Sequence, residues 1–383
     1  MVLGDLGADI IKVEAVPVAS SKGAGLYGGA DIEALKSAAA FNALNRNKKS
    51  IRINMKSDEG RKVFYKLVGD TDVVVEGFRP GAVKRMGADY ETLKNINPRI
   101  VYCSLSGYGQ DGPYNQYPGH DINYISIAGA LNLIGRPDDR PAIPLNFIAD
   151  FGGASMHGAI GILAALFVRE RTGKGQYVDI SYTDSVITLM TFFLQQHFGG
   201  GLKFPRGEWA LGGGYPYYQC YECKDGKLLS LGCLEPWFWD NLCKALDRDD
   251  LKQYCFQVTH FMQKPDNPKF IEVENELKQI FKGKTRDEWF EFLVKFDVPA
   301  GKVYTLEEIA ADPQLKHRQM VLEFDHPKLG KVKHPGIAIK LSDTPGKVRN
   351  LAPYSGEHTN EVLKSAGYSQ ADIEQLRNSN AIG

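Results

Sequence analysis

The sequence predicts an α/β fold, in which a large domain with a mostly parallel sheet is followed by a smaller α+β domain. In the first half of the chain, apolar strand-like runs at 72–76 and 99–105 flank a helical pattern at 89–96. Strands that alternate with helices at this spacing are typical of βαβ units and a parallel sheet. Near residue 199 the pattern changes to glycine-rich, polar sequence, which indicates a linker before a domain of another kind.

The other predicted elements continue these patterns. A helix from about Gly152 to Arg171 is small and apolar on nearly every face, so we expect it to be buried. A hairpin is predicted at 215–232, because Asp225-Gly226 is a favoured two-residue turn. The remaining elements are a helix end and a strand within 7–14, a helix over 58–69, a strand at 177–180, helices over roughly 236–310, short extended runs at 330–354, and closing helices at 359–366 and near 370–377.

These patterns divide the chain into three segments. We expect a large α/β domain over residues 1–198, a linker with a small α+β domain over 199–328, and a C-terminal return to the large domain over 329–383. The chain opens on the tail of a helix, whereas an α/β domain rarely does so. We therefore expect that an N-terminal strand of the large domain is missing from this sequence.

The 383-residue chain carries 46 Lys+Arg and 46 Asp+Glu, so its formal net charge is zero. No global field favours nucleic acid or an anionic membrane, and an anionic ligand must be held by local basic clusters. The sequence shows neither a secretory signal nor an uninterrupted apolar run of about 18 residues. We expect a soluble, cytoplasmic protein without nucleic-acid or membrane partners.

Six cysteines are scattered along the chain, and Cys220 and Cys223 form a C-x-x-C. A zinc site needs a second ligand pair, and a redox pair usually opens a helix, whereas this pair lies in an aromatic stretch that indicates a strand. We expect reduced, structural thiols and no metal site.

The heptapeptide Pro118–Tyr124 places ionisable side chains between a Pro-Gly turn and an apolar helix start. In one interpretation Asp121 caps the helix and His120 is a turn residue. In the other, His120 is an acid or a base, because the pKa of imidazole lies near neutrality. The heptapeptide alone favours neither.

Asp150 ends an apolar run and stands before small residues that open the long helix. A carboxylate there is usually a helix cap, which the local sequence favours, although an α/β sheet also presents reactive groups at such positions. The small residues Gly152–Ala154 permit close approach of a ligand or tight helix packing. Glu235 likewise precedes a Pro-started helix, which favours a cap. The triple glycine at 212–214 indicates either a lid or an interdomain hinge.

Two basic clusters, at 45–52 and 77–85, lie in loops next to βα elements. Each cluster alone is ordinary solvated surface. Together, at the ends of adjacent units of one sheet, they would bind the phosphates of a nucleotide-like ligand.

Several separated motifs resemble the family III CoA-transferase (CaiB/BaiF) superfamily, which includes the α-methylacyl-CoA racemases. The motifs span nearly the whole chain and are Leu6–Glu14, Val75–Gly81, Ser106–Gln110, Arg171–Gln176 and Gly356–Thr359. The resemblance implies a Rossmann-like large domain that binds coenzyme A and an interlocked homodimer. It also implies an acyl-CoA substrate and no tightly bound cofactor. The family's usual N-terminal strand and Gly-Pro turn are absent from this sequence.

By the same resemblance, Asp150 is the catalytic aspartate of both branches. The racemase branch adds a histidine, an asparagine and a glutamate, which match His120, Asn146 and Glu235. Transferases usually carry another residue where His120 stands. The predicted coenzyme-binding residues are Arg46, Lys48, Gly77, Arg79, Arg85, Asp121 and Tyr124.

The sequence therefore favours a 2-methylacyl-CoA racemase, in which His120 and Asp150 transfer protons on opposite faces of an enolate. The alternative is a transferase that moves CoA between carboxylic acids through an Asp150 anhydride and an aspartyl-CoA thioester. Residues 296–303, 342–346 and 212–214 resemble that branch. We weight the site more heavily than the scaffold, because function is carried by sites. A third alternative, a subunit that only binds CoA, disagrees with the retained acid/base groups.

Overall fold

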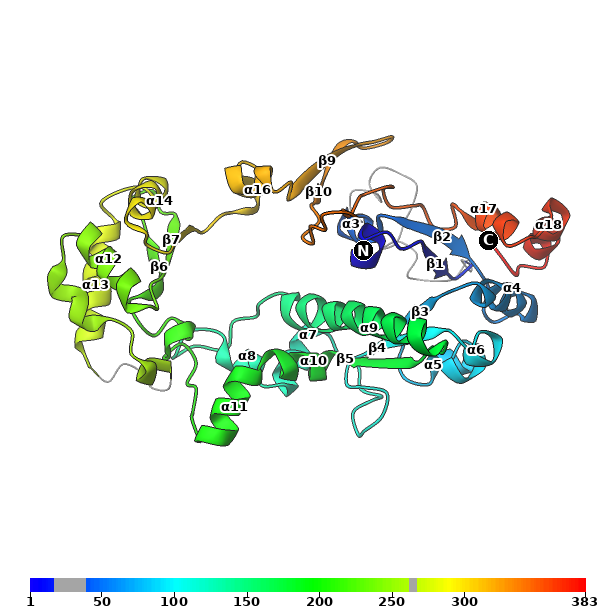
Figure 1. The fold of residues 1–383 in the computed structure, drawn as a ribbon, viewed down its shortest axis with the longest axis horizontal. Helices are drawn as coiled ribbons and strands as arrows, with labels where there is room; N and C mark the ends of the chain where they lie inside the picture. Colours follow the sequence, from blue (N-terminus) through cyan, green and yellow to red (C-terminus); the bar gives the residue numbers. More distant parts are fainter. Residues whose placement is uncertain (17–38, 262–266) are drawn as a thin grey trace. The chain divides into compact units, whose positions relative to one another are not determined.

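The computed structural model describes residues 1–16, 39–261 and 267–383, which form two compact units (Figure 1). Unit 1 consists of Met1–Ser106, Gly158–Asp179 and Leu306–Gly383, and unit 2 consists of Gly107–His157 and Ile180–Thr305. The N-terminal and C-terminal parts of the chain therefore belong to the same unit. The domain boundaries expected after residues 198 and 328 stay a prediction.

Unit 1 contains parallel strands, as the sequence predicts. β1 (Ile10–Glu14) pairs in parallel with β2 (Lys48–Arg52), and β3 (Val73–Glu76) pairs in parallel with β4 (Val101–Ser106). β5 (Tyr177–Ser181) lies on the other edge of β4, and β4 is buried along almost its whole length, as expected of a central strand. Among the described residues these strands form two separate sheets, whereas the sequence predicted one.

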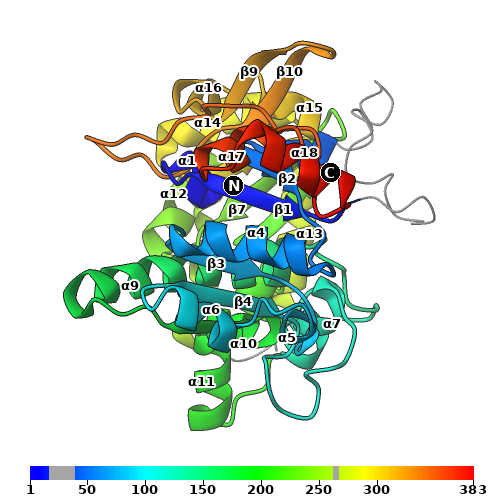
Figure 2. The same cartoon turned by 90° about the vertical axis from the view of Figure 1, so that its right-hand side faces the viewer.

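The helices predicted over 58–69 and 89–96 are present in unit 1. The helices and the remaining strands of this unit are α1 (Val2–Asp5), α3 (Ala39–Asn45), α4 (Asp58–Gly69), α5 (Ala82–Arg85), α6 (Tyr90–Ile96), α15 (Leu306–Ile309), α16 (Pro313–His317), β9 (Val321–His326), β10 (Gly330–Pro335), α17 (Thr359–Ser365) and α18 (Gln370–Asn378). α4 begins after Ser57, whose hydroxyl accepts a hydrogen bond from the Gly60 amide at 3.0 Å. α4 and α6 are in contact and lie along β3 and β4 (Figure 2).

The C-terminal segment packs against β2. The His358 amide donates to the Ser50 carbonyl at 2.9 Å, and α17 lies beside β2 (Figure 1). Val362, Leu363 and Ile373 are buried in one cluster with apolar residues of β2 and α4. The C-terminal segment is therefore held against β2 by hydrophobic packing as well as by hydrogen bonds.

A buried ion pair lies at the centre of the same contact. The Arg46 guanidinium donates to Asp5, with 3.0 Å from Nε to Oδ1 and 2.7 Å from Nη2 to Oδ2, and both residues are at most 4% exposed. The Asn47 amide donates to the same carboxylate at 2.8 Å and to the Lys347 carbonyl at 2.8 Å. Arg46 also donates to the Pro335 carbonyl at 2.6 Å. The N-terminal helix, the start of β2 and the C-terminal segment therefore meet at one satisfied charge pair.

We expect Asp5→Ala to lower the free energy of unfolding by about 3–5 kcal/mol, because it leaves the buried Arg46 guanidinium without its counter-charge. Urea denaturation measures the change. Glu361→Ala is the matched control, since its ion pair with Lys49 is about half exposed on both sides and contributes about 0–1 kcal/mol. Equal losses in the two variants would contradict the role given to the buried pair.

Unit 2 contains the predicted hairpin. β6 (Tyr218–Glu222) and β7 (Leu228–Gly232) pair antiparallel around a turn in which Gly226 has a φ of 73°, and β8 (Ala300–Lys302) extends the sheet. The helices of unit 2 are α7 (Asp121–Ile127), α8 (Ala130–Leu133), α10 (Tyr182–Leu189), α11 (Thr191–Gly200), η3 (Ala210–Gly212), α12 (Pro236–Ala245), η4 (Asp249–Tyr254), η5 (Val258–Phe261), α13 (Lys269–Phe281), α14 (Arg286–Leu293) and η6 (Val294–Phe296). α13 and α14 contact the antiparallel sheet, and Trp239 of α12 is fully buried in the same core.

The long apolar helix has two parts. A π-helical segment, η2 (Phe147–Ser155), leads into the α-helix α9 (Met156–Thr172). The prediction that the whole helix is buried is wrong: Ile160, Leu163 and Phe167 of α9 are 63%, 50% and 59% exposed. The buried residues Gly158, Ile162, Ala165 and Arg169 lie on the opposite face of α9. In the described part of the chain, Phe147–Thr172 is the one helical stretch long and apolar enough to cross a membrane, by length and composition alone.

Candidate functional site

Asp150 lies inside η2 and does not cap it. Its carboxylate oxygen Oδ2 is 3.4 Å from the Asn146 amide nitrogen, which donates to it. The position before η2 is taken by Asn146, so the helix cap that the local sequence favours for Asp150 is wrong. The Ser155 hydroxyl donates to the Asp150 carbonyl at 2.6 Å and so closes the wide π-helical turn. Such turns are frequent at functional sites, because they redirect a side chain out of regular helical register.

The pKa of the Asp150 carboxyl is raised above its ordinary value. Burial is the main cause, since it penalises the ionised form, and the Asp121 carboxylate adds to the rise. The hydrogen bond from Asn146 and the nearby His120 act in the opposite direction. Asp150 therefore holds its proton more readily than a solvated aspartate, which suits a group that both takes and gives protons.

His120 stands before the first residue of α7. Its backbone amide donates to the Asn123 side chain at 3.0 Å, and the Asn123 amide donates to the His120 carbonyl at 2.8 Å. The helix start is thus completed by Asn123 and by the His120 backbone, and the His120 side chain is exposed. The interpretation in which Asp121 caps α7 is wrong, because His120 takes the cap position.

Asp121 is almost completely buried and faces η2. Its Oδ2 atom accepts hydrogen bonds from the Ala149 amide at 2.8 Å and from the Asp150 amide at 2.9 Å. Only 3% of the Asp121 surface is exposed, and its predicted contact with coenzyme A stays a prediction. Sequence reasoning missed the two hydrogen bonds because the partner amides are 28 and 29 residues further along the chain.

Close packing explains the glycines after Asp150. A Cβ atom on Gly153 would come within 2.9 Å of the Ile148 carbonyl oxygen and within 3.3 Å of the Ser185 side chain on α10. Of the two alternatives for these small residues, tight packing is therefore present. Tyr182, also on α10, has a raised pKa, caused by burial and then by the charge of Asp150. No motif pointed to Tyr182, because it is distant from Asp150 in the sequence.

Glu235 occupies the cap position of α12, but its side chain makes no capping hydrogen bond. The Phe238 amide donates at 3.0 Å to the Glu235 backbone carbonyl instead. The side chain is exposed, and within the described residues no hydrogen bond or ion pair joins it to Asp150. The structure therefore brings together His120, Asn146 and Asp150, whereas the catalytic role of Glu235 stays a prediction.

The triple glycine is a packed turn. Gly213 has a φ of 84°, in the left-handed region that favours glycine. A Cβ atom on Gly214 would lie 2.4 Å from the carbonyl carbon of Glu208, and one on Gly212 would lie 2.7 Å from the Trp209 indole nitrogen. Local packing or backbone conformation thus explains why each of the three positions is glycine. Neither a lid nor a hinge is needed to explain the three glycines.

The predicted coenzyme-binding residues that follow β3, in the loop and at the end of α5, are accessible. Gly77, Arg79 and Arg85 are exposed, and so is Phe78, which the sequence reasoning did not select and which is 54% exposed. The Glu76 carboxylate accepts a hydrogen bond from the Phe78 amide at 2.7 Å and so orders the start of this loop. An exposed aromatic ring directly before Arg79 was the missed signal.

The other predicted coenzyme residues are differently placed. Arg46 is 0% exposed and paired with Asp5, and Tyr124 is 8% exposed and donates to the Gly119 carbonyl at 2.6 Å. Lys48 begins β2, so the prediction that the basic cluster at 45–52 lies in a loop is wrong for residues 48–52. Burial, then Lys12, lowers the pKa of Lys48. Since β2 and β3 belong to separate sheets among the described residues, the expected meeting of the two basic clusters at one sheet edge is not observed.

The cysteines form a structural set. Cys220 lies on β6 as predicted, Cys223 is 2% exposed, and burial raises the pKa of the Cys223 thiol to about 11. All six thiols are free. Across residues 1–16, 39–261 and 267–383, no three His, Cys, Asp or Glu side chains gather in a way that could hold a metal ion.

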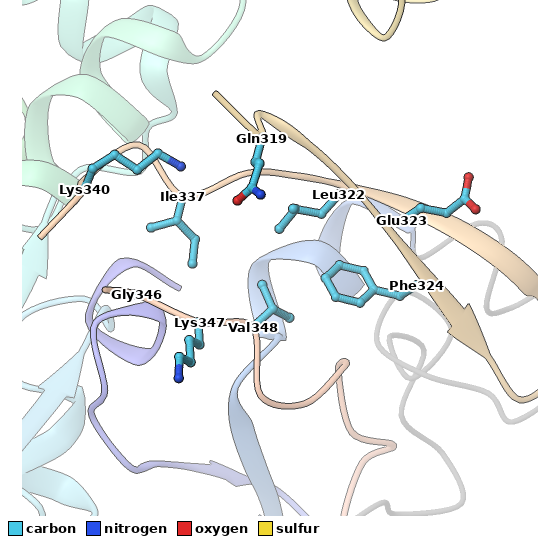
Figure 3. A pocket seen from close by; sticks show the side chains of 9 residues that line it. All are labelled: Gln319, Leu322, Glu323, Phe324, Ile337, Lys340, Gly346, Lys347 and Val348. Carbon is cyan, nitrogen blue, oxygen red and sulfur yellow. The ribbon is translucent and has the colours of Figure 1, made fainter. Parts of the chain in front are cut away.

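Unit 1 also contains a cavity of about 310 Å³ (Figure 3). It lies between the β9–β10 hairpin and the segment that follows it, and its walls include the apolar side chains of Leu322, Phe324 and Val348. Lys340 and Lys347 stand at its rim. None of the residues predicted to be catalytic or to bind coenzyme A lines this cavity.

Asp150 is an accessible carboxylate with a raised pKa, and the imidazole of His120 lies near it. This combination, on a scaffold of helices and parallel strands, is typical of the active site of an enzyme. The comparison with known families specifies which kind. The model of the CoA-transferase family III matches residues 1–359, and the chain belongs to this family.

Relatives with two different activities are equally similar to the chain. The alpha-methylacyl-CoA racemase of Mus musculus is 32% identical over 376 residues, which cover 98% of this chain and 91% of that protein. The formyl-CoA:oxalate CoA-transferase of Escherichia coli O157:H7 is 32% identical over 398 aligned residues, which cover 98% of this chain and 93% of that protein. Overall identity does not separate the two reactions.

Solved structures agree with the fold. A CaiB/BaiF family protein from Brucella suis is 31% identical, with a TM-score of 0.79 and coverage of 95% of this chain and 93% of that chain. The protein Rv3272 from Mycobacterium tuberculosis is 25% identical, with a TM-score of 0.74 and coverage of 94% and 92%.

We expect Asp150→Asn to be at least as stable as the wild type near neutral pH. Because burial raises the pKa of Asp150, the folded state binds this proton more tightly than the unfolded state. The stability that this group contributes is thus present below its ordinary pKa of 3.8 and is lost as the pH rises through the raised pKa. Denaturant unfolding at several pH values should show that the advantage of the Asn variant shrinks toward pH 3.8.

The matched control is Asp138→Asn, which changes an exposed carboxylate in a loop of the same unit. Its free energy of unfolding should stay within about 0.5 kcal/mol of the wild type at every pH. A loss of stability in Asp150→Asn near neutral pH would contradict the assigned cause of the raised pKa.

Proposed function

We propose that the protein is a 2-methylacyl-CoA racemase-type isomerase, which inverts the carbon atom next to the thioester carbonyl. The observation that carries the proposal is the pair formed by Asp150 and His120. Asp150 is a half-buried carboxylate with a raised pKa, and the exposed His120 is close enough to lower that pKa. Inversion needs one group that removes the α-proton and a second group that supplies a proton to the opposite face.

In the proposed reaction, one of the two groups takes the α-proton, and the electrons of the C–H bond move into the thioester carbonyl to form an enolate. The other group, in its protonated form, then gives its proton to the opposite face of the same carbon, and the carbonyl re-forms. The roles exchange in the reverse direction. A group in this role works best when its pKa is near the working pH, and burial moves the pKa of Asp150 in that direction.

The transferase is the second candidate. In that reaction the Asp150 carboxylate attacks the thioester carbonyl and expels the CoA thiolate, which gives an acyl-aspartyl anhydride. The thiolate then attacks the aspartyl carbonyl, which forms the aspartyl-CoA thioester and releases the donor acid as a carboxylate. The acceptor carboxylate attacks this thioester and expels the CoA thiolate, and the thiolate attacks the acceptor carbonyl of the resulting anhydride, which gives the new acyl-CoA and regenerates the Asp150 carboxylate. The formyl-CoA:oxalate CoA-transferase relative supports this candidate, because it is as similar to the chain as the racemase relative. The reaction uses Asp150 but requires no second acid/base group.

Deuterium exchange separates the two reactions. We expect the protein to incorporate deuterium at the α-carbon of a chiral 2-methylacyl-CoA in deuterated water without an acceptor acid, as measured by mass spectrometry. Asp150→Asn should abolish this exchange. His120→Ala should reduce it by about 10²–10⁴-fold, because one of the two proton-transfer groups is lost.

The control for the histidine is His197→Ala, which removes an exposed imidazole of α11 in the same unit. Its exchange rate should equal that of the wild type. No exchange by the wild type, together with transfer of CoA to an added carboxylate, would favour the transferase and rule out the racemase.

We infer that the coenzyme part of the substrate binds at the loop after β3 and at the short helix α5 that follows this loop. The exposed Arg79 and Arg85 offer cationic groups for phosphates, and the exposed ring of Phe78 offers a surface for a base. Gly77 allows the backbone to be approached closely. The buried Arg46 supports the fold around its ion pair in this proposal, rather than contacting phosphates directly. CoA then enters as part of the substrate and is not a tightly bound cofactor.

We propose that the exposed apolar face of α9 packs against a second copy of the chain, as the family resemblance implies for a homodimer. Ile160, Leu163 and Phe167 recur three and four residues apart and so share one helix face, and Met156 extends it at 43% exposure. An apolar face of this extent marks an interaction site in most proteins. We also propose a cytoplasmic location, which the six free thiols support.

We expect Ile160→Glu to convert a dimer to a monomer in sedimentation experiments, because it places a charge in the apolar contact. Phe198→Glu, on an exposed residue of α11, is the control and should leave the dimer intact. A wild-type protein that sediments as a monomer, or that co-floats with lipid vesicles through α9, would contradict the proposed contact.

A further inference from the structure

Asp121 is a buried residue of α7, and its carboxylate accepts hydrogen bonds from the backbone of a different helix, η2. Its Oδ2 atom accepts hydrogen bonds from the Ala149 amide at 2.8 Å and the Asp150 amide at 2.9 Å. Both amides lie in the first turn of η2, where backbone N–H groups lack partners within the helix. The contact therefore holds the main chain of the residue that carries the reactive carboxylate.

The second carboxylate oxygen of Asp121 is unusual. Oδ1 is buried and has no hydrogen-bond partner in the part of the chain that the structure describes. A buried carboxylate with one unsatisfied oxygen is costly, and a neutral asparagine would offer one oxygen to the same two amides without burying a charge. The property that asparagine would not supply is the negative charge next to Asp150.

We propose that Asp121 is a positioning residue for Asp150, which holds the Asp150 amide in place and keeps a fixed negative charge beside the reactive carboxylate. The inference rests on the proposed function of Asp150, and it concerns the same site. It does not depend on whether Asp150 transfers a proton or attacks a thioester, because both reactions need the carboxylate at a defined place.

The charges around Asp150 come from two packed helices. Within the described residues, the ionisable groups coupled to Asp150 are Asp121 and His120 of α7 and Tyr182 of α10. Burial raises the pKa of Asp150 most, the hydrogen bond from Asn146 lowers it, Asp121 raises it and His120 lowers it. Asp121 thus opposes the pull of a protonated His120, and the carboxyl of Asp150 keeps its affinity for a proton.

Two variants separate the hydrogen bonds from the charge. Asp121→Ala removes both, and we expect kcat to fall by about 10²-fold with little change in KM, because Asp150 is no longer held in place. Asp121→Asn keeps an acceptor for the two amides but removes the charge. We expect this variant to stay folded, to retain most of kcat and to lower the pKa of Asp150.

Two readouts are independent of activity. Amide hydrogen exchange should become faster at Ala149 and Asp150 in Asp121→Ala but not in Asp121→Asn. A carbon-13 NMR titration, with the Asp150 signal identified by its absence in Asp150→Asn, should show a lower pKa in Asp121→Asn than in the wild type. Ser181→Ala is the control: it removes the 3.1 Å cap of α10, which packs on η2, and should change neither readout.

The failures of the two proposals are distinguishable. If Asp121→Ala leaves kcat and the exchange of the Ala149 and Asp150 amides unchanged, the positioning role is overturned, even where Asp150→Asn abolishes activity. If the pKa of Asp150 stays the same in Asp121→Asn, the role of the charge is overturned. A wild type without activity on acyl-CoA would overturn the proposed function alone, since exchange and titration still test Asp121.

Discussion

The candidate site depends on a contact between the Asp121 side chain and the main chain of η2. The start of a helix carries N–H groups without partners, and the nearest carboxylate ordinarily accepts from them. Here the Asp121 carboxylate, from a separate helix, accepts hydrogen bonds from the Ala149 and Asp150 amides. Because that demand is met from α7, the Asp150 carboxylate does not accept from these amides and interacts with the Asn146 side chain. Of the two aspartates, Asp121 holds the main chain of η2, and Asp150 stays available for the proposed chemistry.

The geometry of η2 follows from the residues around it. A π-helical turn is wider than an α-helical one, and the Ser155 hydroxyl satisfies the Asp150 carbonyl within it. Gly153 lets Ser185 of α10 approach so closely that a Cβ atom on residue 153 would lie 3.3 Å from its side chain. This packing excludes water from part of the Asp150 carboxyl, and burial is the main cause of its raised pKa. The backbone, the packing and the protonation behaviour of the site are therefore linked.

The sequence predicted the elements whose signals are local. The strands β1, β3, β4 and β5, the hairpin at Gly226 and the helices at 58–69 and 89–96 follow from short-range periodicity and turn residues, whereas β2 was predicted as a loop. Functions that depend on distant partners were not predictable in this way. Asp121 and Arg46 both looked like ligand contacts, but their partners lie 28 and 41 residues away and bury them. The sequence of an apolar helix likewise does not reveal which of its faces the rest of the chain covers. In α9 only one face is buried.

The balance between the two candidate reactions rests on what each asks of Asp150. A nucleophile must be ionised when it attacks, so a raised pKa reduces its reactive fraction, although partial burial also strips water from the anion and makes it more reactive. A proton-transfer group gains directly, because a pKa nearer to the working pH lets it both accept and donate. Only the racemase reaction also needs His120, whose charge acts on the carboxyl of Asp150. The chemistry of Asp150 is thus compatible with either reaction, and the imidazole beside it shifts the balance toward proton transfer.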